Sequence, residues 1–130
     1  MSNVIHLRRA LLVALGGALG TAARLGLTLL IPDAGGFPFA IITANVVGAF
    51  LIGILTGWPA DMPTRRADLR IFLGTGILGG FTTYSAFTVG SIQLWTDAPV
   101  LALLYAALSL VLGVAAAVAG IRLARSGAAT

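Results

Sequence analysis

The residues best suited to chemistry form one short stretch, residues 74–87, which reads GTGILGGFTTYSAF. The adjacent glycines Gly79 and Gly80, and the threonines after them, weaken a helix. An interrupted helix frees main-chain carbonyl groups, and carbonyl oxygens suit a hard cation such as Na⁺. The hydroxyl groups of Thr83 and Ser85 can donate hydrogen bonds to an anion. The stretch therefore predicts an ion site, and the structural alternative is a patch of small residues that packs helices together.

Two aromatic residues follow the threonines. Tyr84 and Phe87 are three positions apart, so they share one face of a helix. The edge of an aromatic ring carries partial positive charge. Rings presented edge-on can therefore line a path for an anion without supplying a full charge.

Other polar residues interrupt apolar stretches and could join this site. Asn45 either donates its amide to an anion or hydrogen-bonds a neighbouring helix. Tyr105 and Ser109 lie four apart on one face, as ordinary interhelical hydrogen bonders or as a track of donors. Arg24 either reaches the headgroups or places a fixed positive charge in a water-filled vestibule that attracts anions.

Membrane helices are expected to carry all of these residues. The chain is 58% hydrophobic and 9% charged over 130 residues, so it cannot cover itself with polar surface. Four stretches reach the ~20 residues that a spanning helix needs, at 10–31, 39–57, 69–94 and 100–123. We therefore predict one all-α domain, 1–130, with four transmembrane helices. The third is interrupted near the bilayer midplane, because residue 82 lies at its centre.

The arginines predict the orientation of the chain. With four spans, the N-terminus, the polar loop at 58–70 and the C-terminus share one side. That side carries Arg8, Arg9, Arg65, Arg66, Arg70, Arg122 and Arg125. Basic residues favour the cytoplasmic side, so we expect both termini in the cytoplasm. The same explanation removes the need for a nucleic-acid partner, and the basic, apolar N-terminus is interpreted as a span rather than a cleaved signal.

At these residues the chain resembles the small bacterial fluoride channels of the Fluc or CrcB family. GGALGTAARLG at 16–26 and NVVGAFLIGIL at 45–55 are similar to motifs of the family's first two spans. GGFTTYSAF at 79–87 is similar to its GGxTTFSTF signature, which is the specific part. The resemblance implies a fluoride channel subunit of the plasma membrane that exports F⁻ passively. It also implies an antiparallel two-subunit assembly with two pores and a central structural Na⁺.

The resemblance also assigns roles by position. Gly79 and Thr82 would offer backbone carbonyls to Na⁺. Asn45, Thr83 and Ser85 would supply donors to the pore, and Tyr84 and Phe87 would occupy its aromatic positions. Tyr105 and Ser109 match a polar track on the fourth span.

Several positions depart from the family pattern. Tyr84 stands where Phe is usual, and Ala86 where the signature has Thr. Ile41 and Gly113 stand where donors are common, and Thr43 lies two residues before Asn45. These departures concern the chain of pore donors more than the fold.

Two other classes of protein compete with a channel. A small multidrug-type transporter has a similar length, but proton-coupled export needs an acid inside the membrane. The chain has no glutamate, and its four aspartates fall at loops or span ends. A non-conducting structural subunit is the second alternative. An enzyme is not expected, because there is no cysteine and the single histidine, His6, lies near the N-terminus.

The same arginines also limit which chain can serve as the second subunit. Seven lie on one side, and the opposite loops hold only Asp33 and Asp97. A chain with this bias should insert one way, whereas an antiparallel homodimer needs insertion both ways. The second subunit is therefore either an identical chain or a homologous chain of opposite bias, and the sequence leaves both open.

Overall fold

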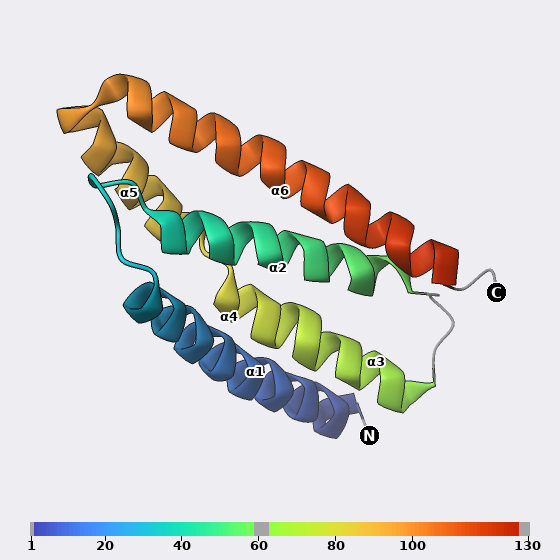
Figure 1. Cartoon of the computed structure of the whole chain (residues 1–130). Helices are drawn as coiled ribbons and strands as arrows, with labels where there is room; N and C mark the ends of the chain where they lie inside the picture. Colours follow the sequence, from blue (N-terminus) through green and yellow to red (C-terminus); the bar gives the residue numbers. More distant parts are fainter. Residues whose placement is uncertain (1, 59–62, 128–130) are drawn as a thin grey trace.

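The computed structural model describes residues 2–58 and 63–127, and this part of the chain is helical apart from short connections (Figure 1). Its elements are α1 (Ser2–Leu30), α2 (Phe39–Gly57), α3 (Thr64–Arg70), the π-helix η1 (Ile71–Leu78), α4 (Gly79–Phe81), α5 (Tyr84–Asp97) and α6 (Pro99–Gly127). Their order confirms the all-helical fold class.

Three helices are long and apolar enough to cross a membrane, at Asn3–Leu30, Phe39–Gly57 and Pro99–Gly127. They contain the stretches predicted at 39–57 and 100–123, and all of 10–31 except its last residue. The stretch predicted at 69–94 is divided among η1, α4 and α5, so no single helix within it reaches that length.

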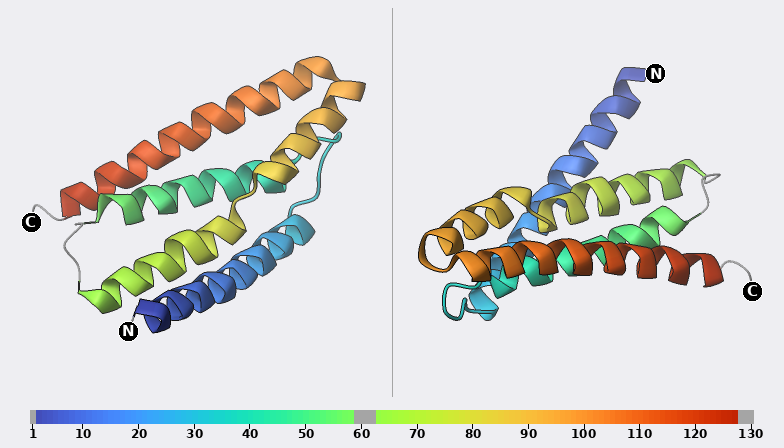
Figure 2. Two further views of the ribbon diagram at one scale, coloured as in Figure 1. Left: turned by 180° about the vertical axis from the view of Figure 1, so that it is seen from behind. Right: turned by 90° about the horizontal axis from the view of Figure 1, so that it is seen from above.

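The helices pair in two layers. α1 packs against η1 and α4, while α2 packs against α6, and α5 also lies along α6 (Figures 1 and 2). The starts of α1 and α3 and the ends of α2 and α6 lie at one end of the bundle (Figure 1). The arginines near these helix ends are therefore gathered on the same side of the molecule.

The polar segment at 58–70 differs from its predicted form as a loop. Residues 59–62 lie outside the described residues, but the chain is helical from Thr64 onward. Asp68, interpreted as a loop residue, is only 5% exposed. Its Oδ2 lies 2.7 Å from Arg8 Nη2 and its Oδ1 lies 3.4 Å from Arg9 Nε. The prediction was wrong because α1 begins at Ser2, well before the apolar stretch, and carries both arginines onto α3.

Glycines allow the paired helices to touch backbone to backbone. A Cβ at Gly20 would overlap the Ile77 carbonyl, and one at Gly80 would overlap the Gly17 carbonyl. In the other layer, a Cβ at Gly53 would overlap the Ala117 carbonyl. Small residues are the usual means of close approach between membrane helices, so these contacts set the register of each pair.

Replacing Gly20 should destabilise the first layer. A methyl group in Gly20→Ala meets the Ile77 carbonyl and the Phe81 amide, and neither can rotate away. Overpacking of this kind costs about 1–3 kcal/mol, which thermal unfolding in detergent would measure. Gly17→Ala is the matched control, since its nearest contact would be the Gly76 carbonyl at 4.0 Å. Equal melting temperatures for the two variants would contradict the proposed packing.

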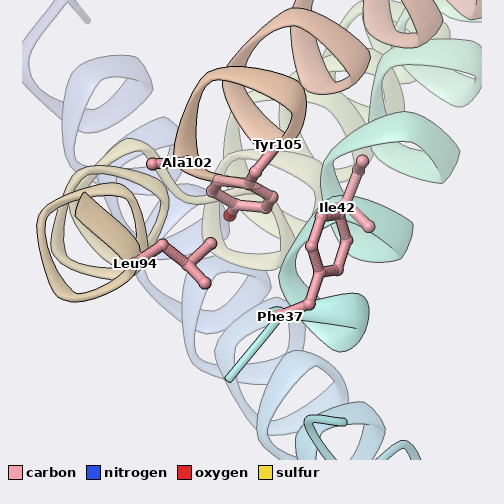
Figure 3. Close-up of a cluster of buried hydrophobic side chains, with 5 residues drawn as sticks. All are labelled: Phe37, Ile42, Leu94, Ala102 and Tyr105. Atoms are coloured by element: carbon pink, nitrogen blue, oxygen red, sulfur yellow. The ribbon is translucent and has the colours of Figure 1, made fainter. Parts of the chain in front are cut away.

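A glycine turn between α1 and α2 places an aromatic residue in the core. Gly35 and Gly36 have φ of 61° and 76°, values that L side chains rarely adopt. The turn closes with a hydrogen bond from the Phe37 amide to the Ala34 carbonyl at 3.1 Å. The Phe37 ring then meets Tyr105 edge-on, with centroids 5.3 Å apart, in a cluster completed by Ile42, Leu94 and Ala102 (Figure 3).

Candidate functional site

The helical path is interrupted between α4 and α5. Thr82 has φ −77° and ψ 155°, and Thr83 has φ −150° and ψ 124°, so both are extended. Thr83 also begins the next helix, because its Oγ1 accepts a hydrogen bond from the Ala86 amide at 3.2 Å. Threonine is a preferred residue at such helix starts, which explains why the helix resumes at Tyr84.

Asn45 of α2 binds the backbone of this extended segment twice. Its Nδ2 donates to the Thr83 carbonyl at 3.0 Å, and its Oδ1 accepts from the Thr83 amide at 2.8 Å. The pairing fixes the orientation of the side-chain amide, because Thr83 offers one donor and one acceptor. An amide nitrogen carries two hydrogens, so one N–H of Asn45 remains for another acceptor.

One turn further along α2, Gly48 accommodates Thr82. A Cβ at Gly48 would overlap the Thr82 Cγ2, so only glycine leaves room for this methyl group. The Thr82 hydroxyl turns back to donate to the Leu78 carbonyl at 2.9 Å. Asn45 and Gly48 therefore hold the two threonines of the interruption against α2.

A cavity of about 340 Å³ opens beside the interruption. It is lined by Asn45, Ala49, Ile52, Thr82, Thr83, Tyr84, Phe87, Ser109 and Leu110. None of these side chains is charged. Six of them were predicted as site residues, and they come from α2, α5, α6 and the interrupted segment. The apolar residues Ala49, Ile52 and Leu110 were missed, although the first two follow Asn45 at helical spacing.

Phe87 links the cavity to the core beneath it. Its ring centroid lies 6.1 Å from that of Tyr84 and 5.3 Å from that of Tyr105. Tyr84 is 81% exposed, whereas Tyr105 is fully buried and does not line the cavity. The hydroxyl groups of Tyr105 and Ser109 are buried without a hydrogen-bond partner among the described residues. Leaving a buried hydroxyl group without a partner costs free energy. These two hydroxyl groups are therefore suited to donate hydrogen bonds to a bound anion.

The remaining predicted residues do not line the cavity. Ser85 is exposed, with its Oγ 3.2 Å from the Thr83 Oγ1. Gly79 is the first residue of α4. Arg24 Nε lies 3.4 Å from the Gly80 carbonyl.

A second cavity, of about 590 Å³, lies nearer the end of the bundle that carries the arginines. Its lining includes Arg9, Thr56, Arg70 and Thr75, but none of the residues predicted as site residues. The larger of the two cavities is therefore not the one that contains the predicted neutral donors.

Three helices of spanning length, around an interrupted segment and a cavity lined by uncharged side chains, define a multi-pass helical membrane protein. A family model described as "CrcB-like protein, Camphor Resistance (CrcB)" matches residues 11–121. The chain belongs to this family, as its motifs predicted.

Curated relatives cover most of the chain. It is 44% identical over 128 residues to "Fluoride-specific ion channel FluC 2" of Leifsonia xyli, covering 92% of this chain and 85% of the relative. It is 45% identical over 113 residues to a protein of the same name from Bacillus subtilis, covering 87% and 85%. It is 39% identical over 123 residues to "Fluoride-specific ion channel FluC" of Caulobacter vibrioides, covering 92% and 97%. These relatives carry the names of channels, not of enzymes.

Proposed function

We propose that this chain is the subunit of a fluoride-selective channel that lets F⁻ leave the cytoplasm passively across the plasma membrane. The observation that carries the proposal is the Asn45–Thr83 pair, which presents a spare amide N–H beside a cavity lined by neutral groups. The curated relatives are named as fluoride-specific channels, which supports the choice of ion.

Neutral donors suit a small, strongly hydrated anion. A pore must replace water around F⁻ at close range, yet it must release the ion again. An amide, hydroxyl groups and ring edges can do this without a cation that would trap the ion. Asn45, Ser109 and Phe87 would form the pathway, with Thr83 and Tyr84 beside it. The buried hydroxyl of Tyr105 would continue this line of donors, and Ser85 would add a hydroxyl group at the edge of the interruption.

The interruption also frees the two carbonyl groups assigned to Na⁺. In a continuous helix the Thr83 amide would bind the Gly79 carbonyl, but it donates to Asn45 instead. The Ala86 amide would likewise bind the Thr82 carbonyl, but it donates to the Thr83 hydroxyl. Main-chain oxygens suit a hard cation. Gly79 and Thr82 therefore fit a structural Na⁺, which would supply positive charge to hold interrupted helices together near the midplane.

A second subunit would complete the site. Tyr84 lies at the cavity and is 81% exposed, so the pathway is open on this side. An antiparallel partner, identical or homologous, would cover it and bring a second interrupted helix to the same axis.

Efflux from liposomes tests the proposed function. Purified chain should release F⁻ much faster than Cl⁻, and replacing Na⁺ with N-methylglucamine throughout purification should reduce the F⁻ efflux. Equal release of the two halides would rule out the fluoride pathway. Full efflux without Na⁺ would contradict the structural Na⁺ but leave the proposed fluoride pathway standing.

The position of the acids argues against a multidrug-type transporter. Asp33 lies in the turn before α2, and Asp97 ends α5. Asp68 is buried, but Arg8 and Arg9 neutralise it at the end of the bundle. None of the three faces the cavity, where a proton-coupled carboxylate would have to lie.

The orientation of the chain decides which partner it uses. We expect a tag on the C-terminus to be cytoplasmic in cells that express this chain alone, because the arginines lie near one end of the bundle. If the tag is cytoplasmic only and fluoride resistance needs a second, homologous gene, the partner is a homologous chain of opposite bias. A tag found on both faces in comparable amounts would contradict the charge argument and leave the homodimer. Protease protection of the tag in spheroplasts and in inverted vesicles would measure the ratio.

A further inference from the structure

The end of α4 is bound by side chains of a different helix. Thr21 Oγ1 and Arg24 Nε both lie 3.4 Å from the Gly80 carbonyl oxygen. Gly80 is in the last turn before the interruption, where a carbonyl loses the amide that would bind it in a continuing helix. That amide belongs to Tyr84, the first residue of α5.

The glycine contacts of α1 explain why these two side chains reach this carbonyl. α1 lies backbone to backbone on η1 and α4 at Gly16, Gly20 and Gly80. Thr21 and Arg24 are three apart, so they share the face of the turn that follows Gly20. These close contacts fix how α1 is aligned along η1 and α4. The Thr21 hydroxyl and the Arg24 guanidinium therefore lie over the end of α4.

We infer that Arg24, together with Thr21, is a positioning residue that caps α4 from α1 and thereby maintains the interruption at Thr82–Thr83. A guanidinium at the C-terminal end of a helix also matches the partial negative charge there. The cap occupies the carbonyl that a continuous helix would use for the Tyr84 amide, so the helix ends here and Thr83 stays free to pair with Asn45.

The cap also determines which carbonyl groups beside the interruption already accept hydrogen bonds. Leu78 receives the Thr82 amide and hydroxyl, and Gly80 receives the two donors from α1. The carbonyls of Gly79 and Thr82, whose helical amides donate elsewhere, are then the ones left for a cation. This consequence rests on the proposed function, whereas the cap itself does not.

Ionic strength separates the cap from the alternative, in which Arg24 attracts anions as a vestibule charge. Attraction at a distance is screened by salt, since the Debye length falls from ~30 Å at 0.01 M to ~3 Å at 1 M. A hydrogen bond to a carbonyl group is much less sensitive to salt. We expect Arg24→Met to reduce F⁻ efflux about tenfold in both low-salt and high-salt liposomes.

Thr21 supplies a test without a change in charge. Thr21→Val should reduce F⁻ efflux about threefold, while Thr21→Ser, which keeps the hydroxyl group, should not. Arg24→Lys should restore most of the efflux lost in Arg24→Met, because an ammonium group can still donate to the Gly80 carbonyl. A double variant that combines Thr21→Val with Arg24→Met should lose more efflux than either single variant, since the Gly80 carbonyl then keeps neither donor.

Amide exchange reports on the cap even if the chain conducts no fluoride. In Arg24→Met and Thr21→Val, amides of residues 79–86 should exchange at least about threefold faster, and those in the middle of α6 should not change. Unchanged exchange at 79–86 would overturn the cap. So would an efflux deficit of Arg24→Met that disappears at high salt while Thr21→Val behaves like the wild type. Absence of F⁻ efflux from the unmodified chain, both alone and with a homologous chain of opposite bias, would instead reject the proposed function.

Discussion

Asn45→Asp is expected to abolish F⁻ efflux. The carboxylate keeps the acceptor for the Thr83 amide, but it loses the donor that binds the Thr83 carbonyl and the N–H left for the anion. It also places a negative charge in the cavity. Two like charges at 4 Å repel by about 4 kcal/mol at the effective dielectric constant of a protein surface. That energy corresponds to roughly a thousandfold loss of occupancy.

The matched variant is Asn45→Ala, which removes the donors without adding a charge. It should reduce F⁻ efflux less than Asn45→Asp, since the anion meets no repulsion. Both proteins should elute as the wild type does in gel filtration, so that a folding defect is not mistaken for a blocked pathway. Efflux within about threefold of the wild type from well-folded Asn45→Asp would falsify the assignment of Asn45 to the pathway.

Phe87→Ile is the second substitution for which we expect a large loss. Phe87 lines the cavity and packs between the rings of Tyr84 and Tyr105. Isoleucine keeps apolar bulk but removes the ring edge that would face the anion, together with two aromatic contacts of ~0.5–1.5 kcal/mol each. We expect efflux to fall about tenfold, the factor that ~1.4 kcal/mol represents.

Phe87→Tyr provides the control, because it preserves the ring. Its efflux should exceed that of Phe87→Ile in the same liposomes. If isoleucine conducts as well as phenylalanine and tyrosine, ring edges have no part in the pathway, and Phe87 serves only to pack the core around Tyr105.

Much of the cavity could be predicted from local patterns. Four apolar stretches predict the helices, because a bilayer demands length and hydrophobicity and little else. Adjacent glycines before two threonines indicate a weak point in a helix, and the structure has both threonines extended. Asn45 left two interpretations open. Its contacts show hydrogen bonds to another segment, and donation to an anion stays a prediction.

Other features could not be predicted, because they depend on residues far apart in the sequence. Arg24 was interpreted either as a side chain that reaches the headgroups or as a vestibule charge. In the structure its Nε donates to the carbonyl of Gly80, 56 residues further along the chain. Asp68 looked like a loop residue until α1 brought two arginines to it. Tyr105 was expected to extend a track of donors; the structure packs its ring against Phe87 and buries it completely, and its role in the track stays a prediction.

Composition and local motifs were enough to establish the membrane class, the helical stretches, the weak point at 79–83 and the family to which the chain belongs. These follow from residues close together in the chain, where solvent and local backbone preference act directly. The meeting of these donors in one cavity, and the contacts of Arg24 with Gly80 and of Asp68 with α1, emerged only from the packing of the helices. Those outcomes depend on the register between helices, which close glycine contacts such as Gly20 on Ile77 and Gly48 on Thr82 set here.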